Sequence, residues 1–511
     1  MKSISEKLNK PVFLISVAVY TILFGFILLF KGPASTVING TMNFTLHNFG
    51  WIYILGYAFV IVISVYLAFS KFGKRRFGGE NAKPEYSFFA WVGMLFCAGL
   101  GVGLVFFGVS EPVSHYLTCP TAESGTFEAL RESMRITLFH WSVSPWAVYS
   151  IVGLAVGYFA YEKGLPPVIS TALYPLLGEK GVKGTPGKIV DAFSLIALVC
   201  GISMSLGFAA VQSVTGIGME MGFSPSFSLI VIATVVIGAC AMCSALSGIQ
   251  RGVKYLSEFN TYLVFALIAF VLLVGPTLNI IKIMVESIGI YLIQFPQMVF
   301  HVDGFGIVEN DLGFNWVESW TVFYWAWWVA FAPFVGTFLA KISKGRTIRE
   351  FILACILMPS LLCMLWFCTF GGSTIWMDLT TMPGLADVVN QSAEGSLFAL
   401  LEVLPLAKIS IFLAIVLIVT LIITSMDSAV FMATVFSCKT DVGLPYAVRV
   451  FWAIYVILNA LLMIWLGGLE LLKFTAVVLA FPFMLIIILM AFGLLREAQG
   501  KPIITRKKKN Q

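Results

Sequence analysis

The sequence predicts an all-α membrane protein with twelve transmembrane helices. Of its 511 residues, 59% are hydrophobic and only 11% are charged, whereas a soluble domain carries about 25% charged residues. Uncharged runs long enough to cross a bilayer, about 20 residues each, recur along the whole chain. This pattern excludes a soluble globule, and the nine cysteines and four histidines show neither a disulfide framework nor the spacing of a zinc site.

Apolar windows place the twelve spans, and the charges between them give the orientation. The expected spans are 12–30, 51–70, 88–109, 137–160, 189–214, 226–247, 259–280, 317–340, 350–370, 407–435, 448–467 and 471–495. The tails and the loops on their side of the membrane hold 26 of the 32 lysines and arginines. Because positively charged loops remain in the cytoplasm, both termini are expected there, and the basic residues indicate topology, with no nucleic-acid partner.

Carboxylates concentrate on the opposite side or lie deep in one span. Glu111 and Asp303 are expected in the outer loops, and Asp427 is the one carboxylate expected deep inside a helix. A carboxylate at that depth is functional or paired. The neighbouring hydroxyls of Thr424 and Ser425 either bond the preceding helical turn or supply oxygen ligands to a sodium ion.

The third span contains three alternate glycines, Gly99, Gly101 and Gly103. Unwound backbone at membrane depth is tolerated only inside protein or along a cavity, where its carbonyls can bind a cation. Close helix packing through small residues is the alternative explanation. A dinucleotide-binding glycine motif is excluded because no βαβ unit surrounds these residues.

The fourth span combines aromatic residues with a proline. Trp146 and Tyr149 are about 60° apart on a helix and share a face, and Pro145 interrupts the hydrogen-bond ladder beside Trp141. Aromatic residues near span ends also form interfacial belts, so a belt remains the alternative here.

The eighth span is more aromatic still. Trp325, Trp327 and Trp328 fall within four residues, Phe331 follows, and Pro333 is expected to interrupt the helix at the same depth. An interfacial belt explains the rings but not the proline.

Rings that face a cavity attract a quaternary ammonium group through their negative faces, at about 0.5–2 kcal/mol each. Rings achieve this without an isolated charge in the membrane, which is expensive. No deep acid is expected near these rings, and this favours a zwitterion over a net cation. The ligand carboxylate would meet backbone amides at the broken third helix.

The two interrupted spans, three and eight, are five apart, as in transporters built from inverted five-helix repeats with a mid-membrane site. The predicted organisation is two extra helices followed by two repeats. Its segments are an N-terminal tail (1–11), two peripheral helices (12–86), a first repeat (87–280), an extracytoplasmic connecting segment (281–316), a second repeat (317–495) and a basic tail (496–511).

Three stretches resemble the betaine/choline/carnitine transporter family, namely 99–112, 139–149 and 323–351. The resemblance runs from about Pro11 to Gly493 and implies a secondary transporter with the amino-acid/sodium symporter fold, a homotrimer in a prokaryotic cytoplasmic membrane. The intact glycine pattern looks like that of glycine betaine carriers, which implies sodium symport of a trimethylammonium zwitterion. A sodium-independent carnitine/betaine exchanger and a proton-coupled choline importer remain alternatives.

The resemblance also implies site residues. The substrate would be bound by an aromatic box and the broken third span, namely Trp141, Trp146, Tyr149, Trp325, Trp327, Trp328, Phe331, Gly99, Leu100, Gly101 and Gly103. One sodium ion would lie between the carbonyls of Cys97 and Leu100 and the hydroxyls of Thr424 and Ser425. A second site at Ser203 and Phe334 is in doubt because Met204 stands where a threonine is expected, and a thioether is a poor sodium ligand.

Phe331 replaces a further tryptophan of the family, which keeps a ring and loses an indole N–H. The basic C-terminal tail suits contact with anionic membrane lipid, although basic residues after a last span also follow from topology alone. A membrane-embedded enzyme would need a titratable cluster beside a nucleophile, and the sequence suggests none.

Overall fold

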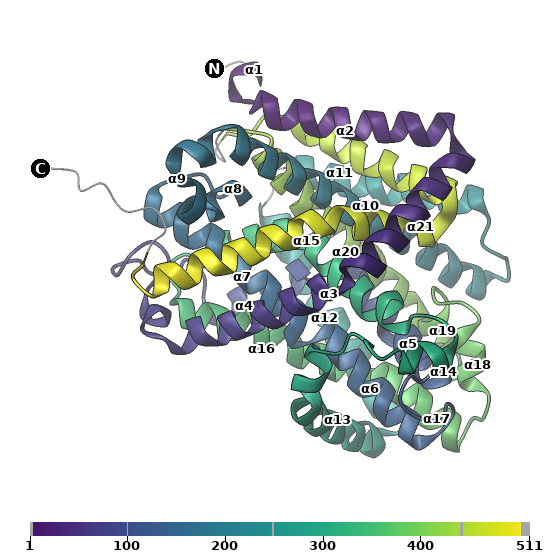
Figure 1. The fold of residues 1–511 in the computed structure, drawn as a ribbon. Coiled ribbons are helices and arrows are strands. Elements are labelled where there is room, and N and C mark those ends of the chain that lie inside the picture. Colours follow the sequence, from purple (N-terminus) through teal and green to yellow (C-terminus); the bar gives the residue numbers. More distant parts are fainter. Residues whose placement is uncertain (1–3, 100, 248–249, 440–442, 502–511) are drawn as a thin grey trace, which may run out of the picture.

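A computed structural model describes residues 4–99, 101–247, 250–439 and 443–501 (Figure 1). The described chain is helical, and its β-type pairings are the isolated bridges Leu8–Cys438 and Arg76–Thr347. Twelve of its helical stretches are long and apolar enough to cross a membrane, which confirms the predicted class. These stretches are Lys10–Leu29, Thr36–Phe69, Phe127–Lys163, Thr185–Met221, Phe227–Leu246, Tyr255–Val274, Thr277–Val299, Glu318–Ile342, Ile348–Thr380, Ala407–Phe436, Tyr446–Leu466 and Ala480–Ala498.

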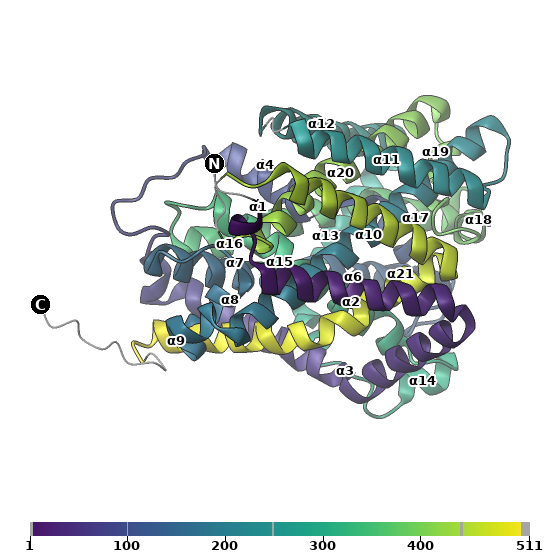
Figure 2. The ribbon, with the colours of Figure 1, turned by 90° about the horizontal axis from the view of Figure 1, so that it is seen from above.

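The α-helices are numbered along the chain. They are α1 (Ile4–Lys7), α2 (Lys10–Leu29), α3 (Lys31–Phe69), α4 (Phe88–Gly99), α5 (Gly101–Leu117), α6 (Phe127–Trp141), α7 (Val143–Lys163), α8 (Ile169–Ala172), α9 (Tyr174–Lys183), α10 (Thr185–Met221), α11 (Phe227–Ser247), α12 (Gln250–Val274), α13 (Thr277–Val299), α14 (Ile307–Leu312), α15 (Phe323–Ile342), α16 (Ile348–Phe367), α17 (Ser373–Thr380), α18 (Leu385–Asn390), α19 (Ser396–Glu402), α20 (Ala407–Phe436) and α21 (Tyr446–Ala498). The described ends of the chain, α1 and the end of α21, lie at the same end of the bundle (Figures 1 and 2).

The third span is broken, as the glycines predict. Helix α4 ends at Gly99 and α5 begins at Gly101, whose φ of +42° lies in the left-handed region. A side chain with a Cβ is strained in that conformation, and glycine is not. The described helices on the two sides of residue 100 have 12 and 17 residues, so neither alone is long enough to count as a membrane-spanning stretch.

Helix α13 is one of the twelve spanning stretches of the structure, in a region where the sequence suggests a connecting segment. Most of the expected segment 281–316 is therefore helical, although only 22% of the apolar window of α13 is buried. At the chain ends, α3 begins at Lys31, well before the expected second span. Helix α21 contains both of the last expected spans, as the separate apolar stretches Tyr446–Leu466 and Ala480–Ala498.

Helices α7, α10 and α15 form the centre of the bundle. The apolar window of α10 is wholly buried, and the windows containing α7 and α15 are 94% and 89% buried. Helices α2 and α11, with 22% and 28%, lie at the periphery. The two aromatic spans therefore meet in the interior of the bundle.

Glycines allow α7 and α15 to cross closely. A Cβ at Gly336 would lie 2.5 Å from Cγ1 of Val152, and one at Gly153 would lie 2.9 Å from the carbonyl oxygen of Gly336. The predicted interruption of the eighth span at Pro333 is wrong, because α15 continues through this residue. The irregular turn lies earlier, as a π-helical turn over Glu318–Val322.

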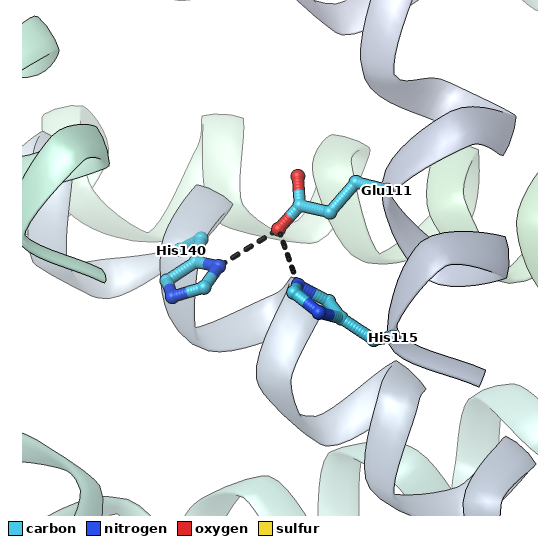
Figure 3. A group of neighbouring side chains, drawn as sticks. All are labelled: Glu111, His115 and His140. Carbon is cyan, nitrogen blue, oxygen red and sulfur yellow. Dashed lines mark hydrogen bonds and ion pairs between the residues drawn. The ribbon is translucent and has the colours of Figure 1, made fainter. Parts of the chain in front are cut away.

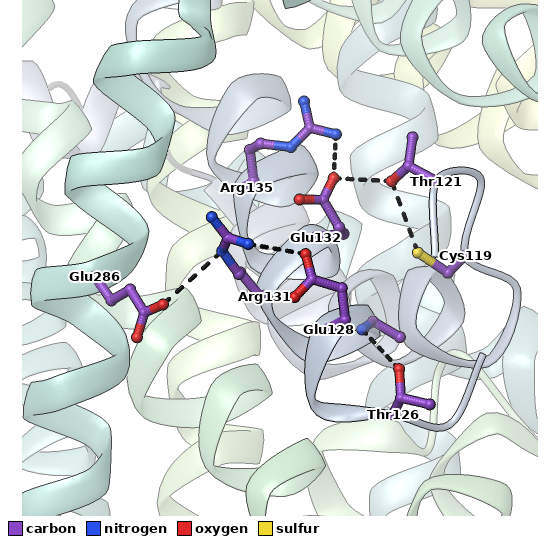
Figure 4. Close-up of polar contacts among 9 residues, drawn as sticks. Cys119, Thr121, Thr126, Glu128, Arg131, Glu132, Arg135 and Glu286 are labelled. Carbon is purple, nitrogen blue, oxygen red and sulfur yellow. Dashed lines mark hydrogen bonds and ion pairs between the residues drawn. The ribbon is translucent and has the colours of Figure 1, made fainter. Parts of the chain in front are cut away.

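A polar network stabilises the N-terminal end of α6 (Figure 4). The Thr126 hydroxyl accepts the backbone N–H of Ala129 at 3.1 Å and so caps the helix. One oxygen of Glu132 accepts from the hydroxyl of Thr121 at 2.8 Å and from the guanidinium of Arg135 at 2.5 Å. These contacts fix the start of the helix that carries Trp141 at its other end.

Candidate functional site

The chain breaks between α6 and α7 at Ser142, whose φ of −95° and ψ of −119° are not helical. The break frees two carbonyls, and two indoles use them: Trp328 Nε1 donates to the oxygen of His140 at 3.0 Å, and Trp146 Nε1 donates to that of Trp141 at 3.2 Å. Pro145 has no N–H that would bond the oxygen of Trp141 in a continuous helix. The interruption predicted beside Pro145 is thus present, and it orients two rings.

Six buried aromatic side chains from α6, α7 and α15 form what we call the ring cluster. Its members are Trp141, Trp146, Tyr149, Tyr324, Trp327 and Trp328, and each is at most 5% exposed. Trp327 and Trp328 stack with centroids 5.1 Å apart, and Trp141 stands nearly perpendicular to both, at 6.0 Å and 4.9 Å. Tyr149 contacts Trp146 at 5.6 Å and Trp328 at 6.2 Å.

Two glycines set how closely the rings approach their neighbours. A Cβ at Gly103 would lie 2.7 Å from Trp327 and 3.3 Å from Trp141, so α5 presents bare backbone to the ring cluster. A Cβ at Gly201 would lie 3.0 Å from Phe331, which sits at the edge of the ring cluster with its centroid 6.3 Å from that of Trp327.

Trp325 belongs to a different stack. Its ring lies parallel to Tyr57 of α3 at 4.4 Å and contacts Phe139 at 5.0 Å. The Tyr57 hydroxyl donates to the backbone oxygen of Trp325 at 2.9 Å. The structure therefore brings five of the expected box residues together, places Phe331 at their edge and turns Trp325 toward the peripheral helix α3.

Two members of the ring cluster carry buried donors without a partner, the hydroxyl of Tyr149 and Nε1 of Trp327. Buried polar groups are nearly always hydrogen-bonded, so each exception calls for an explanation such as a ligand or a water molecule. Both groups can donate to an anionic oxygen.

A buried carboxylate, which the sequence analysis misplaced, lies against the ring cluster. Glu111 is expected in an outer loop, but it lies in α5 with a fully buried side chain. Its Oε2 accepts from Nε1 of Trp141 and from the Tyr324 hydroxyl, both at 2.5 Å. Its Oε1 accepts from Nδ1 of His140 at 2.8 Å and lies 3.4 Å from Nε2 of His115 (Figure 3). The expectation that no acid lies near the rings is therefore wrong.

Glu111, His115 and His140 form the titratable cluster that sequence inspection did not suggest. One ligand atom of each lies within 4.8 Å of the others, close enough to share a metal ion. The only sequence signal was the i, i+4 spacing of Glu111 and His115, which places them on one helix face. His140 comes from another helix, and sequence spacing cannot reveal that contact.

The expected sodium ligands lie in α4, α20 and a position outside the described residues. Cys97 belongs to the last turn of α4, and Leu100 is not among the described residues. The Thr424 hydroxyl donates to the oxygen of Thr420 at 2.7 Å and accepts Nδ2 of Asn260 at 3.1 Å. The helical back-bond considered for Thr424 is thus present, and an unforeseen asparagine from α12 faces the same oxygen.

Ser203 and Asp427 form hydrogen bonds within the protein. The Ser203 hydroxyl donates to the backbone oxygens of Val199 at 2.7 Å and Val456 at 3.1 Å. Asp427 accepts from the hydroxyl of Ser244 in α11 at 2.7 Å, which provides the partner that a buried carboxylate requires. Phe334 is buried in α15.

Known proteins resemble this chain over most of its length. It is 38% identical to the glycine betaine transporter OpuD of Bacillus subtilis, over 90% of this chain and 88% of that protein. It is 35% identical to a probable glycine betaine transporter of Desulfitobacterium hafniense, over 91% and 92%. It is also 35% identical to an ectoine/hydroxyectoine transporter of Virgibacillus pantothenticus, over 94% and 95%.

Among solved structures, a Na+-coupled sialic acid symporter in a substrate-bound outward-open state matches 87% of this chain and 86% of its own, with 12% identity and a TM-score of 0.47. Residues 11–502 match the betaine/carnitine/choline family transporters. That match covers nearly the whole protein, and it makes the chain a transporter and not an enzyme. The chain is therefore a multi-pass membrane protein of the betaine/carnitine/choline transporter family.

Proposed function

We propose that this transporter imports a trimethylammonium zwitterion, most specifically glycine betaine, by sodium symport. We place it in a prokaryotic cytoplasmic membrane with both termini in the cytoplasm. The names of two relatives, at 38% and 35% identity, support the substrate. A relative named for ectoine has the same 35% identity, so the substrate has to be argued from the site.

The observation that carries the proposal is the ring cluster. Its six aromatic side chains come from three helices and are buried in the interior, where a ring face attracts a desolvated quaternary ammonium group most strongly. The closest ring pairs have centroids only 4.9 Å and 5.1 Å apart. A trimethylammonium group held between two ring faces requires these rings to separate, so binding is coupled to movement of α6 or α15.

The zwitterion is supported by the partnerless donors. The Tyr149 hydroxyl and Trp327 Nε1 are buried members of the ring cluster and suit a carboxylate. This support replaces the argument from a missing acid, because Glu111 contacts Trp141 and Tyr324. Three hydrogen bonds and an adjacent imidazole already compensate that carboxylate, so it does not by itself demand a cationic ligand.

The sodium coupling is supported by the glycine break of the third span and by Thr424 and Ser425 of α20. Backbone carbonyls at an interrupted membrane helix can bind a cation, and the hydroxyl of Thr424 is buried in the same bundle. We propose no second site at Ser203, because Met204 stands where a threonine is expected and a thioether is a poor sodium ligand. We therefore propose one sodium ion per substrate at this position.

Uptake of labelled glycine betaine by proteoliposomes tests the proposal. Concentrative uptake under an inward sodium gradient, absent under an equal potassium gradient, is expected. Uptake that needs betaine or carnitine inside would identify an exchanger. Choline uptake driven by a proton gradient would identify the other alternative, and stronger competition by ectoine than by glycine betaine would reject the trimethylammonium substrate.

We also propose a homotrimer and contact of the basic tail with anionic lipid. Family membership supports the trimer, and the tail carries six lysines and arginines from Arg496 onward. Native mass spectrometry of the purified protein gives the subunit number directly. Removal of residues 502–511 is expected to weaken the dependence of uptake on anionic lipid.

A further inference from the structure

One carboxylate joins the two sides of the ring cluster. Glu111 lies in α5, its donor Trp141 ends α6, and its donor Tyr324 lies in the first turn of α15. Trp141 and Tyr324 are themselves in contact, with centroids 5.6 Å apart. The same oxygen, Oε2, therefore accepts from rings on two different helices.

The rings that Glu111 contacts directly are those that contact Trp327 and Trp328. Trp141 lies 4.9 Å from Trp328 and 6.0 Å from Trp327. Tyr324 lies 6.3 Å and 5.9 Å from the same two rings. A rotation of either donor ring would change the surface offered by the stacked tryptophans.

His140 adds a second connection. Its Nδ1 is within 2.8 Å of Oε1 of Glu111 and its Nε2 is within 3.0 Å of the hydroxyl of Thr321. Because an ionised carboxylate can only accept, Nδ1 is the donor. The backbone oxygen of His140 also accepts Nε1 of Trp328, so the position of this residue sets a third ring of the ring cluster.

A metal ion between Glu111, His115 and His140 is the competing explanation of the same geometry. Glu111 already accepts three hydrogen bonds. Two of them come from the indole of Trp141 and the phenol of Tyr324, and neither group is a metal ligand in this arrangement. His115 has no well-directed hydrogen bond, although its Nε2 lies 3.4 Å from Oε1. The full set of donors therefore indicates a hydrogen-bonding centre.

We propose that Glu111 is a positioning residue for substrate binding, which orients Trp141 and Tyr324 from behind the ring cluster. This inference rests on the proposed function, because it assigns the ring cluster to the substrate. It adds the reason why a buried carboxylate occurs beside a site for a cationic group. Glu111 acts through the rings and does not touch the substrate.

Two substitutions of Glu111 compare the loss of every hydrogen-bond acceptor with the retention of one acceptor. Glu111→Leu removes every acceptor, leaves the N–H of Trp141 and the O–H of Tyr324 unpaired, and is expected to raise the KM for glycine betaine about tenfold or more, with a smaller change in maximal rate. Glu111→Gln keeps one carbonyl oxygen for those two donors, while its NH2 group can face the other tautomer of His140. It is expected to raise KM only about threefold.

Tyr324→Phe removes one of the two donors and is expected to give a KM between those of the wild type and Glu111→Leu. This variant tests the inference even when Glu111→Leu fails to fold. Tyr116→Phe is the matched control. Tyr116 lies in α5, the helix of Glu111, and donates to the carboxylate of Asp378 at 2.9 Å, outside the ring cluster. This control is expected to leave KM unchanged.

A spectroscopic readout does not depend on transport. In protein labelled with 5-fluorotryptophan, the 19F resonance of Trp141 is assigned by its loss in Trp141→Phe. It is expected to shift in Glu111→Leu and to remain near its wild-type position in Glu111→Gln. Failure of the wild type to take up glycine betaine would reject the proposed function, while this comparison would still test the link between Glu111 and Trp141.

Three results would overturn the inference. One is an unchanged Trp141 resonance together with an unchanged KM in Glu111→Leu. Another is complete loss of uptake in Glu111→Gln with an unchanged resonance, which would assign the role to the charge itself. The third is wild-type uptake that EDTA abolishes and zinc restores, which would make the three residues metal ligands.

Discussion

Gly103 and Trp327 are in direct contact: a Cβ built on Gly103 would lie 2.7 Å from the outer edge of the Trp327 ring. The same Cβ would lie 3.3 Å from Trp141, so a single methyl group would press on two rings that belong to different helices. The glycine-rich segment thus has two physical roles, since Gly101 permits the left-handed turn at the break and Gly103 permits close approach to the ring cluster.

Gly103→Ala is therefore expected to displace Trp327 and Trp141. Overpacking of a buried site costs about 1–3 kcal/mol, which as a binding free energy is a loss of apparent affinity for glycine betaine of about 5- to 150-fold. Uptake kinetics in proteoliposomes measure it. Gly93→Ala in α4 is the matched control, because a Cβ there meets nothing within 4 Å. Equal kinetics of the two variants would mean that the tight contact does not matter for binding.

Replacement of Trp328 tests the attraction between rings and a quaternary ammonium group. Trp328→Leu is expected to raise the KM for glycine betaine by about 3- to 30-fold, the loss of one ring worth about 0.5–2 kcal/mol. Trp328→Phe retains a ring and loses the bond from Nε1 to His140, so a smaller effect is expected.

The ligand offers a complementary test. The uncharged-headgroup analogue 3,3-dimethylbutanoate has the shape of glycine betaine without its positive charge. It is expected to compete at least about tenfold more weakly than glycine betaine. Equal competition would show that shape and burial, rather than charge, determine recognition.

Thr424→Val tests the sodium site with little change in volume. Loss of the hydroxyl is expected to raise the sodium concentration for half-maximal uptake about tenfold, with a smaller effect on betaine affinity at saturating sodium. Thr434→Val is the control, because Thr434 is buried in the same helix and donates only to the oxygen of Val430 at 2.8 Å. If both variants show the same sodium dependence, Thr424 is not a ligand.

The polar network at the N-terminal end of α6 contains one buried ion pair and two exposed ones (Figure 4). Arg135 and Glu132 have side chains only 10% exposed, and removal of one partner from such a pair costs about 3–5 kcal/mol. Arg135→Ala is therefore expected to lower the melting temperature in detergent markedly.

Arg131→Ala provides the comparison within the same helix. Arg131 is 40% exposed and pairs with Glu128 and Glu286, which are 57% and 68% exposed. Exposed pairs contribute about 0–1 kcal/mol, so only a small shift in melting temperature is expected. A larger loss of stability in Arg131→Ala than in Arg135→Ala would contradict the assignment of the network to the Glu132 pair.

Much of the bundle is predictable because the rules are local. A run of about 20 apolar residues suffices to predict a membrane helix. The alternate glycines around Gly101 predict either a break or close helix packing, and the structure contains both, at Gly101 and at Gly103. Proline is a weaker signal. Pro145 coincides with a break because the chain leaves the helix at Ser142, whereas Pro333 lies inside the continuous helix α15. The flanking packing, including the close crossing at Gly336, decided between these outcomes.

The candidate site shows the same division. Tryptophans in the fourth and eighth spans are visible in the sequence, and five of the expected rings do meet in the structure. Nothing in the sequence indicates that Trp325 stacks on Tyr57 or that Asn260 faces Thr424. These two contacts join residues that are 268 and 164 positions apart. They lie on helices whose rotation the sequence leaves undetermined.

The sequence by itself determined the membrane class, the backbone freedom of the glycine segment and the aromatic character of two central helices, since hydropathy, glycine content and ring content belong to single segments. Only the tertiary structure decided what surrounds the rings. Glu111 comes after the end of the expected third span (88–109), which suggests an outer loop, yet the fold buries it between Trp141, Tyr324 and His140. A buried carboxylate is stable only where donors converge on it, and here those donors come from separate helices.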